Sequence, residues 1–430
     1  MHKRWLTLTA VFMAVAIVAA ACGGSGTPAP VASSAAAKAT ATTAASKGEI
    51  IIASDFPTSG KDASDGLPAQ NGAQFAVEQA GTIKGFTLKF LPLDDAVNGV
   101  HDPAKGVQNV QQLLGNSKVL GMVGPFNSNV AFAEIPVANR GSLAMISPSN
   151  TNECLTQTFA YCNPQPSALR PTGTNNYFRV AAADTFQGPA MADYAIDQLK
   201  IKKIAVWSDN ETFGKGVANN FSKELEKKGG TIVLRQDFDT KTTKDWRAFL
   251  SDAKNKGAEG IYAGATSGTS VCIPRAQMKD IFTTDIPYMT PDGGVNQQCI
   301  TDAGANANTG MYGTVAAADA AQNPDAKATI DAFKVKFPKS TDQGSYTFPS
   351  YDCARILIDA IGRAIDANGG NMPTREQVVK AVSETKGLKL TTGTYTMDKN
   401  GDPTTPTMAI FQVKGTPPAW TFLKQFSVGQ

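Results

Sequence analysis

Short apolar runs alternate with amphipathic stretches along most of the chain, as β-strands and α-helices do when they follow one another. The runs expected to be strands in the first half are Ile50–Ser54, Phe86–Leu93, Val119–Val123 and Leu143–Ser147. Between the first two, apolar residues recur at i, i+3, i+4 and i+7 over Gln70–Ala80, which predicts a helix. Such alternation predicts a parallel sheet covered by helices on both faces.

The pattern begins again after residue 180. The stretches expected as strands are Lys203–Trp207, Thr231–Arg235, Gly260–Gly264 and Pro287–Thr290, and those expected as helices are Lys215–Lys228, Asp245–Lys256 and Ile273–Phe282. A long helix over Tyr351–Ile365 and a strand over Met408–Lys414, after an Asn400-Gly401 turn, follow. A chain of 430 residues is too long for one ordinary core. The sequence predicts an α/β fold of two doubly wound, Rossmann-like domains with a ligand cleft between them.

Two of the expected strands run directly into turns of small and polar residues. The strand Val119–Val123 leads into Gly124-Pro125-Phe126-Asn127-Ser128, and Leu143–Ser147 leads into Pro148-Ser149-Asn150-Thr151. The carboxyl ends of adjacent parallel strands face one crevice, where backbone N–H groups at the next helix start attract anions. The two turns are therefore candidates to hold one small carboxylate or phosphate, although most such turns in α/β domains bind nothing.

The first 48 residues lie outside the predicted fold. Residues 1–21 form a signal peptide, with His2, Lys3 and Arg4 before an apolar run, and small residues before Cys22 favour a bacterial lipoprotein signal over ordinary secretion. Residues 22–48 are rich in Gly, Ser, Thr, Pro and Ala and are interpreted as a lipidated cysteine with a flexible tether. Removal of the signal leaves 38 basic and 37 acidic residues, a net charge of +1 that suggests no nucleic-acid partner.

Five further cysteines fit an oxidising compartment. Cys154 and Cys162 are eight residues apart on either side of a polar loop and form the natural local pair. Cys272 and Cys299 are a candidate second pair, which leaves Cys353 as an expected buried free thiol. The chain has no CxxC spacing, so no structural zinc site is predicted.

The residues needed for common enzyme chemistry are missing. After removal of the signal only one histidine, His101, remains, and no GxSxG, P-loop or HExxH motif occurs. A metal site would have to consist of carboxylates alone, and Asp94-Asp95 is the only acidic pair at a strand end. We therefore expect no catalysis, no metal and no cofactor.

Several segments together resemble the Leu/Ile/Val-binding family of ABC-transporter substrate-binding proteins, which have the type I periplasmic binding protein fold. The resemblance covers nearly all of the chain from Ile50. It is carried by Asn71-Gly72-Ala73, Leu93-Asp94-Asp95-Ala96, the VLGMVGPFNS and ISPSNT turns, Phe178-Arg179-Val180, Asp184, Gln187-Gly188-Pro189 and the Asp209-x-x-x-Phe213-Gly214-x-Gly216 motif. Their order and spacing are more specific than any one of them.

The resemblance implies roles for individual residues. The two turns would hold a ligand carboxylate through Phe126, Asn127, Ser128, Ser149, Asn150 and Thr151, and Asp292 would neutralise a ligand ammonium. Phe213, Thr266 and Asp65 occupy other pocket positions and depart from the family pattern. Phe213 lacks a hydroxyl, Thr266 stands where aromatic residues are common, and the first loop offers Asp62 and Asp65 rather than tyrosine. These departures favour a more polar ligand than leucine.

The resemblance further implies an extracytoplasmic, lipid-anchored and monomeric binder that delivers an amino acid to a membrane ABC permease by hinge closure. The lobes would comprise residues 49–180 with 315–402 and residues 181–314 with 403–430, with crossings near Val180–Ala183, Thr314–Ala318 and Asp402–Thr407. Amides, urea-like solutes and aromatic or carboxylic acids remain rival ligands. A ligand-sensing ectodomain and a lipoprotein enzyme remain rival classes.

Overall fold

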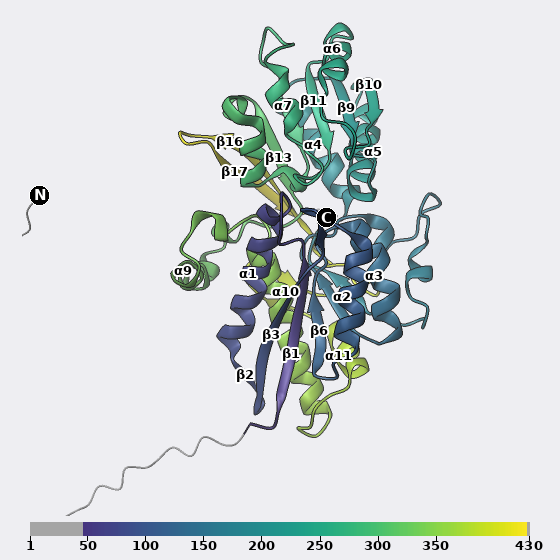
Figure 1. Cartoon of the computed structure of the whole chain (residues 1–430), viewed down its shortest axis with the longest axis vertical. Coiled ribbons are helices and arrows are strands. Elements are labelled where there is room, and N and C mark those ends of the chain that lie inside the picture. Colours follow the sequence, from purple (N-terminus) through teal and green to yellow (C-terminus); the bar gives the residue numbers. More distant parts are fainter. Residues whose placement is uncertain (1–45, 428–430) are drawn as a thin grey trace, which may run out of the picture. The chain divides into compact units, whose positions relative to one another are not determined.

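A computed structural model describes residues 46–427. The predicted signal peptide, Cys22 and nearly all of the predicted tether lie outside these residues. Within them the chain forms two α/β lobes, each built on its own sheet (Figure 1). The prediction of two parallel-sheet domains is confirmed.

The sheet of the first lobe has six strands in the order β2-β3-β1-β6-β7-β8. Their bounds are β1 Glu49–Phe56, β2 Thr82–Ile83, β3 Phe86–Asp94, β6 Val119–Val123, β7 Ala144–Ser147 and β8 Tyr177–Arg179. All pairs are parallel except β2 with β3. Its helices are α1 Ala63–Ala80, α2 Pro103–Leu114, α3 Ser128–Arg140, α9 Lys327–Lys336, α10 Thr347–Ala367 and α11 Arg375–Ser383.

Alternation along β1 explains why helices cover both faces of this sheet. Ile50, Ile52 and Phe56 pack into a core with α1 and α10, whereas Ala53 points to a core with α2 and α3. Figure 1 shows α2 and α3 together on one side of β1 and β6. The strand is buried on both faces, as a central parallel strand requires.

The sheet of the second lobe has seven strands in the order β10-β9-β11-β12-β13-β16-β17. Their bounds are β9 Lys203–Ser208, β10 Thr231–Asp237, β11 Gly260–Gly264, β12 Tyr288–Thr290, β13 Met311–Val315, β16 Thr407–Lys414 and β17 Ala419–Ser427. The last two strands pair antiparallel. Its helices are α4 Asp184–Asp197, α5 Thr212–Lys227, α6 Arg247–Asn255, α7 Ile273–Met278 and α8 Gln297–Ala303.

Smaller elements complete the described chain. Two short hairpins pair β4 Ala96–Val97 with β5 Val100–His101, and β14 Leu388–Lys389 with β15 Thr394–Tyr395. Single 3-10 turns are η1 Glu153–Leu155, η2 Pro166–Leu169, η3 Asp292–Gly294, η4 Gly304–Asn306, η5 Ala320–Gln322, η6 Pro324–Ala326 and η7 Ser340–Asp342. The chain passes between the two sheets after β8, after β13 and before β16. The residue boundaries of the lobes stay a prediction.

Some predicted bounds are wrong. The first helix begins at Ala63, not Gln70, because Gly66 and Pro68, which usually mark loops, lie inside it. Helix α7 ends at Met278, four residues before the predicted Phe282. The strand β17 carries no prediction at all, because its exposed and half-buried residues form no apolar run.

Candidate functional site

Two turns at the carboxyl edge of the first sheet lie side by side. Gly124 follows β6 with a φ of 122°, a conformation that favours glycine, and its N–H donates to the Ile146 carbonyl on β7 at 2.9 Å. The Phe126 carbonyl accepts two hydrogen bonds from the second turn, from Ser149 Oγ at 2.9 Å and from Asn150 Nδ2 at 2.7 Å. The two turns therefore form one hydrogen-bonded unit.

The start of α3 belongs to this unit. Asn127 is the N-cap residue, yet its side chain makes no capping hydrogen bond, and its buried Oδ1 has no partner. Ser128 Oγ accepts from the Asn152 N–H at 3.3 Å. The first N–H groups of a helix favour an anion. A ligand carboxylate at this point would meet helix N–H donors and the uncommitted amide of Asn127.

The second lobe places a carboxylate opposite the turns. Asp292 begins η3, directly after β12, and is 4 % exposed. Tyr346, at the start of α10 in the first lobe, donates its hydroxyl hydrogen bond to Asp292 Oδ2, and the Gly293 N–H donates to Oδ1 at 3.1 Å. Burial raises the pKa of Asp292 to about 6, although these donors oppose the shift. A ligand ammonium would lower that pKa and keep the carboxylate charged.

A cavity of about 20 Å³ lies between these groups. Larger hollows of about 560 to 790 Å³ open elsewhere, but none gathers both a turn of the first lobe and Asp292. Residues from both lobes line the small cavity: Phe126, Asn127, Ser128 and Ser149 from the first, and Phe213, Thr266, Asp292 and Gly293 from the second. Seven of the ten residues expected to bind ligand are therefore brought together.

The other three expected residues do not line this cavity. Asn150 supports the turn from inside the lobe, since Nδ2 donates to Phe126 and Oδ1 accepts from the Tyr177 hydroxyl at 2.9 Å. Thr151 is fully buried, and its Oγ1 has no partner. Asp65 accepts from Asn296 Nδ2 of the second lobe at 2.7 Å. Asp65 thus joins the two lobes in this structure rather than lining the cavity.

A second contact between the lobes centres on His101, the one histidine that remains after removal of the predicted signal. His101 Nδ1 lies 2.8 Å from Asp62 Oδ2 in its own lobe, and Nε2 lies 2.9 Å from Glu211 Oε2 in the second lobe. Asp62 Oδ1 also accepts from the Gly268 N–H at 2.8 Å. We call Asp62, His101 and Glu211 the latch.

The latch favours a protonated imidazole. Burial alone would lower the pKa of His101, but hydrogen bonds to Asp62 and Glu211 and their negative charge raise it well above its usual value. An imidazolium that donates a hydrogen bond from each ring nitrogen, to Asp62 and to Glu211, forms an ion-pair network across the two lobes. Both ring nitrogens face carboxylates, so within residues 46–427 His101 forms no nucleophile–base pair.

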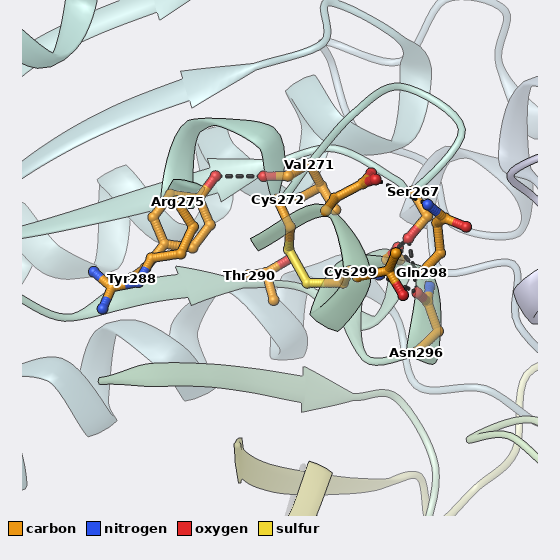
Figure 2. The surroundings of a disulfide bond; sticks show 12 residues. Ser267, Val271, Cys272, Arg275, Tyr288, Thr290, Asn296, Gln298 and Cys299 are labelled. Atoms are coloured by element: carbon orange, nitrogen blue, oxygen red, sulfur yellow. Dashed lines mark hydrogen bonds between the residues drawn. A yellow bond between two sulfur atoms is a disulfide. The ribbon is translucent and has the colours of Figure 1, made fainter. Parts of the chain in front are cut away.

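A disulfide supports the cavity from the second lobe (Figure 2). Cys272 and Cys299 are bonded, as are Cys154 and Cys162, whereas Cys353 is a buried free thiol. Asn296 Oδ1 accepts from Ser267 Oγ at 2.8 Å and from the Cys299 N–H at 2.9 Å. The bridge therefore links the Thr266 loop to the segment that carries Asn296.

A buried ion pair holds the second turn, which follows β7, in place. Arg179 on β8 is fully buried, and its Nε donates to Asp402 Oδ1 at 2.7 Å. Its other nitrogens donate to the Asn150 and Asn152 carbonyls at 3.1 and 2.9 Å and to Thr156 Oγ1 at 2.7 Å. Arg179 thus ties the turn to two chain crossings between the lobes.

No helix among residues 46–427 is long and apolar enough to cross a membrane. The family model described as "Periplasmic binding protein" matches residues 49–417. Leu/Ile/Val-binding protein homolog 3 of Brucella melitensis is 29 % identical over 372 residues, which are 86 % of this chain and 92 % of that protein.

Solved structures with the same fold include proteins with different ligands in their names. A leucine binding protein, LivK, from Thermotoga maritima matches with a TM-score of 0.75 and 24 % identity, over 88 % of this chain and 99 % of that one. A solute binding protein from R. palustris, in complex with benzoate, matches with a TM-score of 0.71 and 19 % identity, over 89 % and 98 %. At these identities the likeness establishes the fold alone.

Proposed function

Because this chain belongs to the periplasmic binding protein family, as its sequence motifs indicate, we propose that it captures an amino acid between its lobes and delivers it to an ABC permease. The observation that carries the proposal is the arrangement around the small cavity. The helix start at Asn127 and Ser128 suits a carboxylate, and Asp292 on the opposite lobe suits an ammonium. A zwitterion would then bridge the lobes.

Closure of the lobes is the proposed mechanism. A cavity of about 20 Å³ has room for roughly one water molecule, so an amino acid enters only when the lobes separate or a lining ring such as Phe213 moves. A ligand that contacts both turns and Asp292 makes fewer contacts when the lobes separate, and this difference favours the closed form. The latch adds contacts that only a closed form can make.

The ligand side chain would meet Phe213 and Thr266, a mixed surface that fits a small or polar amino acid as well as a branched one. A carboxylic acid without an amine is the second candidate. The Tyr346 hydroxyl already donates to Asp292, so this carboxylate has a partner even when no ammonium is present. Amides and urea-like solutes bound in the same cavity, and a sensing role, are further alternatives.

The test is thermal unfolding of residues 49–430, freed of ligand by denaturation and refolding, against amino acids, amides and carboxylic acids. At a thousandfold over the dissociation constant a true ligand adds about 4 kcal/mol of stability, a shift of several degrees. Stabilisation by amino acids that Asp292→Asn abolishes would support the proposal. Stabilisation only by acids without an amine would reject the role of Asp292, and no response to any solute would reject the ligand class.

The proposed location is the outer face of the cytoplasmic membrane, with a lipid on Cys22 and the following residues as a tether. We expect Cys22→Ala to move the protein from the membrane fraction to the soluble fraction. Retention of that variant in the membrane fraction would contradict the lipid anchor. Delivery to a permease would appear as loss of solute uptake in cells that lack the protein.

A further inference from the structure

Three acidic side chains from separate elements meet inside the first lobe. Asp55 lies near the end of β1, Asp95 directly follows β3, and Glu134 lies in the middle of α3. All three are fully buried, with exposures of 0 %. One carboxylate oxygen from each lies within 4.8 Å of the others. We call these three residues the acidic triad.

Most of the triad's oxygens have no hydrogen-bond partner. Both oxygens of Asp95, both of Glu134 and Oδ2 of Asp55 are unpaired, and only Asp55 Oδ1 accepts a bond, from Asn109 Nδ2 at 2.8 Å. Buried carboxylates in folded proteins are almost always paired, because an unpaired one costs several kcal/mol. Five orphan oxygens at one point indicate a missing partner.

Another buried acid, Asp352, shows how donors can satisfy such a group in this fold. Asp352 on α10 is equally buried, yet it accepts from the N–H groups of Thr391 and Thr392 at 2.9 and 2.8 Å and from both hydroxyls. The triad has no comparable set of donors. Asp184 on α4 is also fully buried with both oxygens unpaired, so the triad differs from other buried acids by gathering three such carboxyl groups at one point.

No basic side chain neutralises the triad. Among the described residues no Lys, Arg or His forms an ion pair with Asp55, Asp95 or Glu134, and His101 nearby uses both ring nitrogens on the latch. Burial raises the pKa of all three carboxyls, to about 7 for Asp55, and the charge of Asp55 raises the pKa of Asp95 and of Glu134 further. At neutral pH the triad requires either bound protons or a cation.

We propose that Asp55, Asp95 and Glu134 bind one hard divalent cation, with Ca²⁺ favoured over Mg²⁺. Ligand atoms are all oxygens, which suits these ions and Mn²⁺ rather than zinc or copper. The three carboxylate oxygens all lie within 4.8 Å of one another, a spacing that Ca²⁺–oxygen bonds of about 2.3–2.6 Å can span. Mg²⁺ dehydrates reluctantly and usually keeps several waters, so three fully buried carboxylates suit Ca²⁺ better.

The position of the triad gives the ion a structural role. Asp95 opens the hairpin of β4 and β5, which carries His101, and its carbonyl accepts from the Asp102 N–H at 2.9 Å. Glu134 belongs to the helix that begins at the ligand-facing turn, and Asp55 to the central strand. One ion would therefore fix the hairpin, the helix and the strand at the edge where the cavity lies.

The test uses the full chain. Because the triad is fully buried, the ion is removed by unfolding in denaturant with EDTA and refolding in metal-free buffer, and metal content is measured before and after. We expect about one ion per chain before stripping, and a rise in Tm of several degrees when 1 mM Ca²⁺ is restored, with a smaller rise for Mg²⁺. Glu134→Gln keeps the side-chain volume and should lose this response.

Glu226→Gln, an exposed change on α5, is the matched control and should keep the full response to Ca²⁺. If Glu134→Gln does not fold, titration calorimetry of stripped wild-type chain with Ca²⁺ decides, and one site per chain supports the proposal. Two results would overturn it. One is native protein without metal whose Tm ignores Ca²⁺, Mg²⁺ and Mn²⁺, which would mean that the triad holds protons. The other is a Ca²⁺ response of equal size in Glu134→Gln and the control.

Discussion

The latch makes stability depend on pH through a single histidine. His101 side chain is about 1 % exposed, and those of Asp62 and Glu211 are 3 % and 27 % exposed. His101→Gln removes a buried cation and leaves both carboxylates without it. Breaking one side of a buried ion pair costs about 3–5 kcal/mol. Because Glu211 is partly solvated, we expect about 3 kcal/mol at pH 6, or roughly 5 °C in Tm.

The sign of the pH effect follows from the direction of the pKa shift. The pKa of His101 is raised on folding from its usual value of 6.5. The latch contribution is therefore complete below about pH 6.5 and is lost as the pH rises through the pKa of the folded state. Between those values it falls by up to about 1.4 kcal/mol per pH unit, which corresponds to one proton.

The assay is the free energy of unfolding of wild type and His101→Gln from pH 6 to 9, at constant Ca²⁺ concentration. Other buried acids near the histidine, Asp95 and Asp209, also titrate with raised pKa values, so only the difference between the two proteins isolates His101. That difference should be largest at pH 6 and shrink as the pH rises. A difference that stays constant across the range would refute the charged latch.

Three further changes test other parts of the site. Asp292→Asn should weaken amino-acid binding at least tenfold, about 1.4 kcal/mol, and leave acids without an amine unaffected in the same titration. Asp402→Asn should cost about 3–5 kcal/mol in denaturant unfolding, because Arg179 keeps its buried charge, whereas an unchanged midpoint would contradict the ion pair. Replacing Cys272 and Cys299 by alanine removes a bridge of sequence separation 27 and should lower the free energy of unfolding by about 3–4 kcal/mol. Wild-type stability in the double variant would argue against the bridge.

The fold was accessible from sequence wherever hydrophobic burial dominates. The strands β1, β6 and β11 are buried along nearly their whole length, so their apolar runs mark them clearly. The long helix α10 also shows its buried stripe. Prediction fails where the signal depends on tertiary contact: Gly66 approaches the backbone of Pro57, so glycine inside α1 reflects close packing rather than a loop.

Part of the candidate site could also be located from sequence, and part could not. The two turns follow adjacent strands, and topology alone brings such turns to one edge of a sheet, so local sequence could locate them. The latch joins His101 to Glu211 across 110 residues and two lobes, and nothing in either segment indicates the other. Each residue looks ordinary in its own segment, a histidine in a polar loop and a glutamate before a helix.

The acidic triad is a second group of distant residues that local sequence does not connect. From sequence, Asp95 is recognisable as part of an acidic pair at a strand end, and no metal is predicted because only one such pair exists. Asp55 lies near the end of a largely apolar, buried strand, and Glu134 occupies the inward face of an amphipathic helix. A charged residue at a position that the pattern assigns to the core contradicts that pattern, since burial of an unpaired carboxylate is costly. Asp55 and Glu134 are two such residues, and both lie close to Asp95. This arrangement argues for a partner shared by the three carboxylates, and one cation can contact all of them.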